Sequence, residues 1–129
     1  MQATIIRPGI ALLANAPSST AITTTAERTT VAVTGELDLA RTDHLASLLG
    51  EELELAPRAL VIDLTGLAFC SARGLGVVLD AVSAARAAGV PVAVVAESRA
   101  VLRPVRALGL EAELPLHRTL AEAENRLAP

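Results

Sequence analysis

Two kinds of hydrophobic periodicity alternate along this chain of 129 residues and predict an α/β architecture. Short β-branched runs at 21–25 and 29–34 are separated by three polar or small residues and predict a hairpin. Continuous apolar runs at 60–62 and 90–96 are typical of strands that are covered on both faces. The pattern therefore predicts a mixed sheet of about four to five strands that begins with an N-terminal hairpin.

Helical spacing of apolar residues lies between and after these runs and predicts about four helices packed against the sheet. The four segments with this spacing or with a helix-start signal are 42–55, from Ser71 to about residue 88, 98–109, and a short segment that begins at Thr119. Thr42 is a candidate N-cap for the first helix, and Pro104 is expected to kink or confine the third. Residues 111–116 predict a weak last strand, and Thr119 with Glu122 forms a capping-box pattern.

The N-terminal segment differs from the rest of the chain. The stretch Pro17-Ser18-Ser19-Thr20 predicts a break before the folded domain. We therefore expect residues 1–18 to form an arm that is loosely ordered or adds a strand, followed by one domain over 19–129. The arm resembles a signal peptide superficially, but its apolar run is too short and follows Pro8-Gly9. No stretch approaches about 18 uninterrupted apolar residues, so we expect no membrane insertion.

Composition excludes several function classes. The net charge of −3 and the near absence of aromatic side chains argue against a nucleic-acid partner, which needs phosphate-neutralising and base-stacking residues. All 11 basic residues counted as Lys or Arg are Arg, a bias typical of a high-GC bacterium. The single cysteine, Cys70, excludes an internal disulfide and fits the reducing cytoplasm.

The segment from Leu64 to Gly76 is predicted to be a small polar loop that leads into a helix N-terminus. Proteins often place ligand, phosphate or partner contacts at such a position. Arg73 lies in the first turn of the following helix, where a cation opposes the helix dipole at a cost of about 0.3–1 kcal/mol. This conflict suggests either a compensating contact or a position that tolerates the cation.

Several segments together resemble the STAS domain of bacterial anti-sigma factor antagonists. They are the strand with Gly-Glu-Leu-Asp at 31–38, Leu-Val-Ile-Asp-Leu-Thr-Gly-Leu at 60–67, the stretch 69–79, and the ending 116–123. The resemblance extends over about residues 20–127 without large gaps and implies the STAS fold.

The resemblance also implies a protein-binding module that acts by partner switching. In that family the unphosphorylated antagonist binds an anti-sigma factor with a histidine-kinase-like ATPase fold, which then releases its sigma factor. The anti-sigma factor uses ATP to phosphorylate a Ser or Thr at the start of the second helix. The added charge, about −1.5 to −2, then disrupts the interface.

This chain departs from the family pattern at the phosphorylation site. The family typically has Asp-Ser-Ser-Gly, with the second Ser as phosphoacceptor. Here Ser71 stands at the Asp position, Ala72 at the first Ser and Arg73 at the acceptor, followed by Gly74. The usual serine phosphoswitch is therefore missing, and Ser71 is expected to cap the helix, with displaced phosphorylation of Ser71 as the alternative.

The predicted partner-binding residues come from two segments that the resemblance places at one edge. They are Glu36, Asp38, Ser71, Ala72, Arg73 and Gly74. Asp38 either contacts the partner or caps the approach to the first helix. Arg73 either pairs with an acidic partner surface, blocks the site, or is simply solvated.

Other readings of the sequence are weaker. Cys70 with His44 or His117 could suggest a thiol nucleophile, but nothing places either histidine beside it, and the scattered residues do not predict a metal site. We therefore expect no catalysis and no cofactor. The alternative function is a STAS subunit of a lipid or anion transport complex that docks on an ATPase or membrane component. Homodimerisation stays open.

Overall fold

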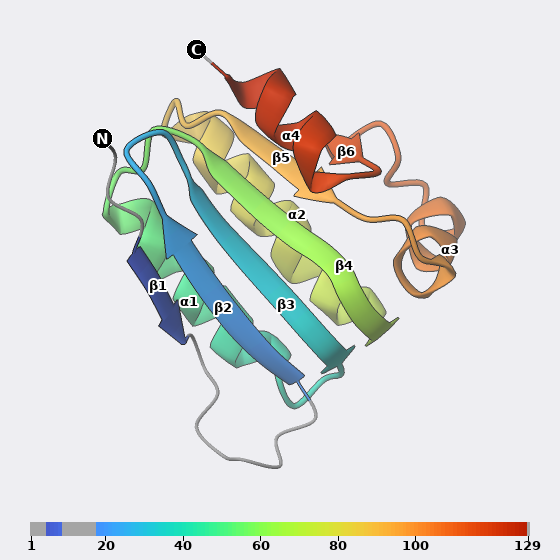
Figure 1. Ribbon diagram of the computed structural model, residues 1–129. Helices are drawn as coiled ribbons and strands as arrows, with labels where there is room; N and C mark the ends of the chain where they lie inside the picture. The colour runs from blue at the N-terminus through green and yellow to red at the C-terminus, as the bar shows by residue number, and fades with distance from the viewer. Residues whose placement is uncertain (1–4, 9–17, 129) are drawn as a thin grey trace.

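A six-stranded mixed sheet organises the residues that the computed structural model describes, 5–8 and 18–128 (Figure 1). The strands are β1 (Ile5–Pro8), β2 (Ser18–Thr24), β3 (Thr29–Leu37), β4 (Leu60–Cys70), β5 (Val92–Val95) and β6 (Leu116–His117), and they lie in this order across the sheet. The first three strands pair antiparallel, whereas β3 to β6 are parallel. The predicted α/β class and N-terminal hairpin are confirmed. The sheet has more strands than predicted because Ile5–Pro8 pairs with β2.

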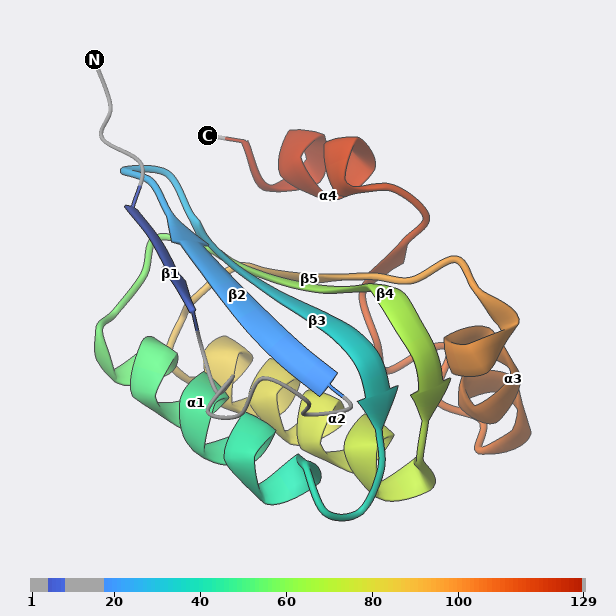
Figure 2. The ribbon, with the colours of Figure 1, turned by 60° about the horizontal axis from the view of Figure 1, so that its bottom comes forward.

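Four helices pack around this sheet in the described part of the chain. Two of them, α1 (Thr42–Glu54) and α2 (Ala72–Ala87), lie side by side on one face. The third helix, α3 (Arg99–Ala107), flanks the carboxyl end of β4, and α4 (Leu120–Leu127) covers β5 on the opposite face (Figure 2). Because the crossovers connect parallel strands, the carboxyl ends of β3, β4 and β5 all lie at the same end of the sheet.

The core is aliphatic, as the composition predicts. The larger cluster fills the space between the sheet and the two helices α1 and α2, and it includes Leu37, Leu45, Ile62, Leu75 and Val78. A smaller cluster on the other face joins Val61, Ala93 and Val95 to Ala123 of α4. Burial of these side chains stabilises the fold by about 25 cal/mol for each Å² of apolar surface removed from water.

Strand β4 continues to Cys70, so the prediction of a loop from Leu64 onward is wrong for its first half. The strand contains two irregularities in its pairing with β3. Between Ala32–Asp63 and Thr34–Gly66, three steps along β4 match two steps along β3. A second extra residue lies between the partners of Gly35 and Glu36.

These irregularities explain why the strand could not be read from alternation. Each extra residue shifts the side-chain alternation by one position, so buried residues recur at a spacing of three instead of two. Leu64, Leu67 and Cys70 all reach the core in this way. Gly66 permits the close approach, because a Cβ there would lie 2.6 Å from Cγ2 of Thr34.

The predicted N-cap of the first helix is also wrong. Arg41 occupies the N-cap position of α1 and makes no side-chain capping bond. Thr42 lies inside the first turn, fully buried, and its hydroxyl donates to the Leu39 carbonyl at 3.0 Å. The hydroxyl therefore stabilises the preceding turn, because burial directs it away from the free N–H groups of the helix.

The chain after β5 differs from the prediction in two respects. Helix α3 continues beyond Pro104 to Ala107, so Pro104 does not confine the helix to one side of its position. Residues 111–114 form turns instead of a strand, because the backbone N–H groups of Glu113 and Leu114 donate to the Leu110 carbonyl. Pairing with β5 begins at Pro115, whose carbonyl accepts from the Val94 backbone N–H at 2.9 Å, and continues in β6. Thr119 caps α4 as predicted, since its hydroxyl accepts from the Glu122 backbone N–H at 3.1 Å.

Candidate functional site

The carboxyl ends of β3 and β4 bring together two segments that are far apart in the sequence. Glu36 is paired in register with Phe69, and Leu37 with Cys70. The backbone N–H of Ser71 then donates to the Leu37 carbonyl at 2.9 Å. The turn after β3 and the first turn of α2 are therefore neighbours, as the resemblance implied for the predicted binding residues.

The start of α2 is fixed by a side-chain cap and by close packing against β3. Ser71 is the N-cap, and its Oγ accepts from the Gly74 backbone N–H at 3.0 Å. Gly74 is buried against β3, where a Cβ would lie 2.9 Å from Cδ2 of Leu37. Ala72 is exposed in the same turn. The only hydroxyl of this turn is thus occupied as a helix cap, the role expected for Ser71.

Arg73 has a partner within the chain. Its Nη2 lies 2.9 Å from Oδ1 of Asp43, which links the first turn of α2 to the first turn of α1. The two side chains are 60% and 82% exposed, so the pair contributes at most about 1 kcal/mol. This pair offsets the unfavourable position of a cation at the helix N-terminus, which is of similar size.

The structure adds Asp43 to the site, and sequence analysis missed it. The two residues of the pair are separated by 30 positions, and no local pattern connects them. An acidic residue in the first turn of a predicted helix is explained by the helix dipole alone, so Asp43 gave no separate signal.

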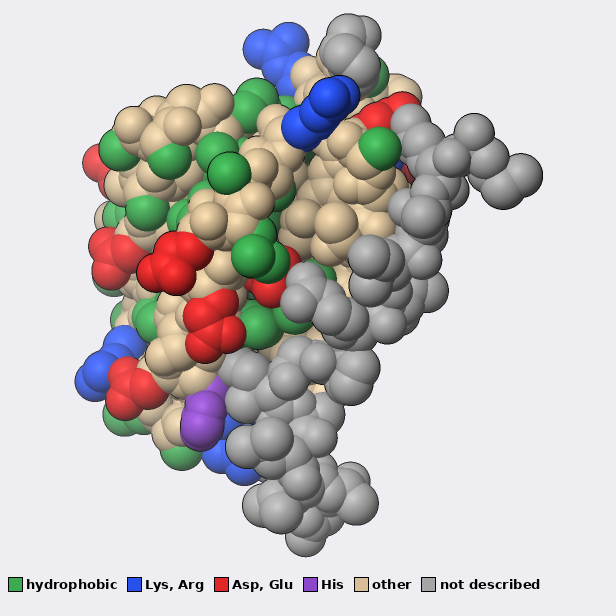
Figure 3. Space-filling model, turned by 90° about the vertical axis from the view of Figure 1, so that its left-hand side faces the viewer, with side chains coloured by type: hydrophobic (Ala, Val, Ile, Leu, Met, Phe, Trp, Pro, Cys, Tyr) green, Lys and Arg blue, Asp and Glu red, His purple; other side chains and the backbone are tan. Residues whose placement is uncertain are grey.

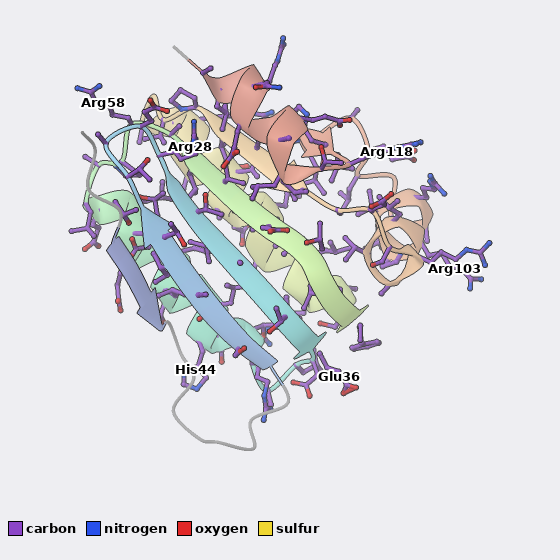
Figure 4. The ribbon with its side chains drawn as sticks, viewed as in Figure 1. Arg28, Glu36, His44, Arg58, Arg103 and Arg118 are labelled. Carbon is purple, nitrogen blue, oxygen red and sulfur yellow. The ribbon has the colours of Figure 1, made fainter. Side chains whose placement is uncertain are left out.

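The turn after β3 presents acidic groups at the same end of the sheet. Glu36 is exposed and lies at the carboxyl end of β3, as Figure 4 shows. Asp38 uses Oδ1 to accept from the Ala40 backbone N–H at 3.1 Å, and the same oxygen lies 3.6 Å from Nη1 of Arg41. Asp38 therefore orders the turn into α1, which is the capping role that the sequence left open.

Two large apolar side chains at this end of the molecule were not predicted as site residues. Leu39 is 66% exposed in the turn after β3, and Phe69 is 49% exposed near the end of β4. Phe69 is the one aromatic residue of the chain, yet it does not join the aliphatic core. Its exposure could not be read from the sequence, because the irregular pairing of β4 decides which way it faces.

We call this region the sheet-end surface. It comprises Glu36, Asp38, Leu39, Phe69, Ser71, Ala72, Arg73 and Gly74, with Asp43 beside Arg73. It combines exposed apolar groups with charged groups on a rigid frame, which is the composition expected of a protein-binding surface.

Comparison with known proteins identifies the family. The STAS domain family matches residues 19–123. The chain belongs to the STAS domain family. A curated relative, the anti-sigma-F factor antagonist RsfB of Mycobacterium tuberculosis, is 36% identical over 112 residues, which cover 84% of this STAS domain chain and 90% of RsfB.

Solved structures show the same STAS fold. A crystal structure of an anti-sigma factor antagonist from Mycobacterium paratuberculosis is similar with a TM-score of 0.76 at 29% identity, covering 92% of this chain and 100% of that chain. The Bacillus protein SpoIIAA in its unphosphorylated form has a TM-score of 0.65 at 19% identity and shows the fold alone. That likeness covers 79% of this chain and 89% of SpoIIAA.

Within this STAS domain, Cys70 is placed for packing. It is buried, and this burial raises the pKa of its thiol to about 11, which disfavours the nucleophilic thiolate. Neither His44 on α1 nor His117 on β6 forms a described hydrogen bond with it. Across residues 5–8 and 18–128, no group of three or more His, Cys, Asp or Glu is arranged to hold a metal ion.

Asp63 of the STAS domain has a structural role. Its Oδ1 accepts from the Thr65 backbone N–H at 3.0 Å and from the Thr65 hydroxyl at 2.7 Å. These bonds lie at the first irregularity of β4 and satisfy backbone groups there.

In the described part of the chain, no helix is long and apolar enough to span a membrane.

Proposed function

We propose that this chain regulates transcription by binding an anti-sigma factor through the sheet-end surface. The relatives support the proposal, because RsfB and the Mycobacterium paratuberculosis protein are both named as anti-sigma factor antagonists. The geometry supports the location, since the two segments that the family resemblance singles out meet at the ends of β3 and β4. Binding of the anti-sigma factor releases its sigma factor, which is partner switching.

The apolar pair Leu39 and Phe69 supplies the binding energy in this proposal. Aromatic side chains that become buried at the centre of an interface are frequent hot spots. Truncating a hot-spot side chain to alanine weakens the binding free energy by about 2 kcal/mol or more. The neighbouring acidic groups Glu36 and Asp38 orient the partner and select against acidic surfaces. The anti-sigma factor is therefore expected to offer an apolar pocket with basic residues at its rim.

The interaction is proposed to lack the serine phosphoswitch. SpoIIAA has been solved in an unphosphorylated and a phosphorylated form. In this chain the family resemblance assigns Arg73, which cannot accept a phosphate, to the usual acceptor position. The observation that carries this part is the use of Ser71 Oγ as a cap for the Gly74 N–H. Phosphorylating Ser71 would remove a cap, although the new charge would favour the helix N-terminus.

The remaining expectations follow from this role. The anti-sigma factor has a histidine-kinase-like ATPase fold, and the complex forms in the cytoplasm, where sigma factors act. The chain itself contributes binding and no catalysis. The relatives named above are antagonists and not transport subunits, so a transport-complex role is not proposed.

Binding to the anti-sigma factor encoded nearest to this gene tests the proposal. We expect tight binding by calorimetry, weakened at least about tenfold by Phe69→Ala or Leu39→Ala, as expected for hot-spot residues. Leu55→Ala and Leu120→Ala are matched controls, because both leucines are exposed outside the sheet-end surface. Leu55 follows the last residue of α1 and is 67% exposed against 66% for Leu39, and Leu120 begins α4. Equal losses in all four variants, or no loss in any, would place the interface elsewhere.

A further inference from the structure

Helix α3 carries three exposed arginines that have no ion-pair partner among the described residues. Arg99, Arg103 and Arg106 follow each other at spacings of four and three, so they lie along one side of the helix. No acidic residue occurs between positions 98 and 110. We call these three residues the α3 arginine row, and Figure 4 shows Arg103 directed away from the molecule.

The α3 arginine row differs from the arginines on several other elements. Arg28, Arg41 and Arg73 each lie within 4.0 Å of a carboxylate, at 3.0, 3.6 and 2.9 Å. Like charges at neighbouring positions of one helix repel each other, so the row destabilises α3 when it has no partner. The nine residues of α3 thus hold a positive surface on a chain whose net charge is −3.

A groove with the opposite character lies between α1 and α2. Its volume is about 190 Å³, and its lining consists mainly of small or aliphatic residues: Ala46, Leu49, Gly50, Leu53, Val77, Ala81 and Ala84. The charged residue in the lining is Asp80, which is exposed. Helix α1 adds exposed Glu51 and Glu54 near its end and contains no arginine. Figure 3 shows acidic side chains gathered on the face of the molecule that α1 occupies.

We propose that the α3 arginine row of one copy docks into the α1–α2 groove of a second copy. The shapes and charges are complementary, because a row of long cationic side chains meets a concave surface lined by alanine and glycine with carboxylates at its edge. The aliphatic stems of the arginines pack along the small residues, and the guanidinium groups reach Asp80 and Glu54. No residue of the sheet-end surface takes part, so this association is independent of the proposed function.

The position of the two surfaces determines the kind of assembly. The groove is lined by α1 and α2, and Figure 2 shows that these two helices lie under the sheet whereas α3 lies at its edge, so the same patch cannot pair with itself. The contact is heterologous, and copies associate head to tail. Because the charges are exposed, the association is weak and decreases as salt screens them over about 10 Å.

The charge pattern favours a second copy over other anionic partners. Nucleic-acid binding requires several phosphate contacts and gains from net positive charge, whereas this chain has a net charge of −3. Segments that bind anionic membranes typically carry clusters of about 4–8 basic residues. The α3 arginine row offers three arginines and no adjacent basic run. The groove on the same chain supplies a surface of matching shape and charge.

Sedimentation of the full chain over a concentration series, at low and high salt, tests the proposal. We expect concentration-dependent association at low salt that high salt abolishes. Arg103→Glu with Arg106→Glu should weaken it by about tenfold or more, because two attractive contacts become repulsive. Arg58→Glu with Arg126→Glu is the matched control, since it makes the same change in net charge at two other arginines without a described ion pair. Figure 4 shows Arg58 far from α3.

Charge reversal of the groove provides the second half of the test. Glu54→Arg with Asp80→Arg should weaken self-association to the same degree, and mixing this variant with Arg103→Glu/Arg106→Glu should restore association. A chain that stays monomeric at low salt would overturn the proposal, as would a groove variant that associates like the wild type or a mixture that stays dissociated. Salt-sensitive binding of the α3 arginine row to phosphatidylglycerol vesicles, without self-association, would assign it to membranes instead.

Discussion

Arg73 Nη2 lies 2.9 Å from Asp43 Oδ1, so the first turns of α2 and α1 are joined at the position that the family resemblance assigns to the phosphoacceptor. The pair is exposed and brings little stability by itself. The pair matters because it orients the Arg73 guanidinium on the sheet-end surface. The family pattern that the sequence resembles has no cation at this position.

This pairing predicts unequal effects of its two alanine variants. Arg73→Ala should change the free energy of unfolding by less than about 1 kcal/mol, because it loses an exposed ion pair but also removes a cation from the positive end of α2. Asp43→Ala should destabilise more, since it leaves Arg73 unpaired there and removes an acidic residue from the first turn of α1. Urea unfolding of both variants and of the double variant measures the difference. A larger loss for Arg73→Ala than for Asp43→Ala would contradict this account.

Two glycines of α2 are predicted to respond in opposite ways to alanine. Gly74→Ala should destabilise by about 1–3 kcal/mol, because its Cβ would lie 2.9 Å from Cδ2 and 3.0 Å from Cγ of Leu37, which is fixed in the core. Gly76→Ala should stabilise by up to about 1 kcal/mol, since no atom lies within 4 Å of its added Cβ and alanine favours the helix. Thermal unfolding followed by circular dichroism compares them. If both alanine variants stabilised the protein, the Leu37 side chain would have to move aside at little cost, which would contradict this prediction.

Ser71 is predicted to stabilise the fold through its cap. Ser71→Ala should cost about 1 kcal/mol, because the Gly74 backbone N–H loses its acceptor. Ser71→Asp should retain the stability, since aspartate also accepts at an N-cap and its charge suits the helix N-terminus. Thr119→Ala, which removes the cap of α4, provides a reference for the measured cost. Equal stability of the wild type and Ser71→Ala would contradict the capping role.

Cys70 gives the protein a distinct pH dependence. The folded thiol has a pKa of about 11 against an ordinary value of 9.0, so the unfolded chain loses this proton first as pH rises. The stabilisation is complete below pH 9.0 and decreases as the pH rises toward 11. With no Lys and no Tyr in the chain, no other side chain is expected to titrate in this window.

Urea unfolding at intervals between pH 9 and 11 measures this effect. The free energy of unfolding of the wild type should decrease by about 1 kcal/mol for each pH unit, the slope of a single proton. Cys70→Ala should be less stable at neutral pH because of the small cavity, yet its stability should hardly change over the same range. A parallel decrease in both proteins would assign the pH dependence to another group.

The order of elements was predictable because most of them bury a regular face. Leu45, Leu48 and Leu49 follow helical spacing, and the run Leu60 to Ile62 is buried on both faces, so periodicity reports burial directly. The second half of β4 was not predictable in this way. Its two extra residues break the alternation, and the register with β3 that produces them depends on pairing between distant segments.

The candidate site was predictable only as far as the family pattern extends. Glu36, Asp38 and Ser71 to Gly74 lie at the predicted edge because they belong to motifs of the chain. Asp43, Leu39 and Phe69 join them through tertiary structure. An ion pair across 30 residues and the exposure of an apolar side chain depend on how the ends of β3 and β4 meet, which no local pattern reports.

The most direct test of the central claim is the affinity for the anti-sigma factor before and after incubation with that factor and ATP, with intact-mass analysis of the same samples. The account predicts that the chain binds, that its mass does not change and that its affinity stays the same, because the family resemblance assigns Arg73 to the acceptor position and the Ser71 hydroxyl caps α2. Stoichiometric phosphate on Ser71 with loss of binding would contradict it.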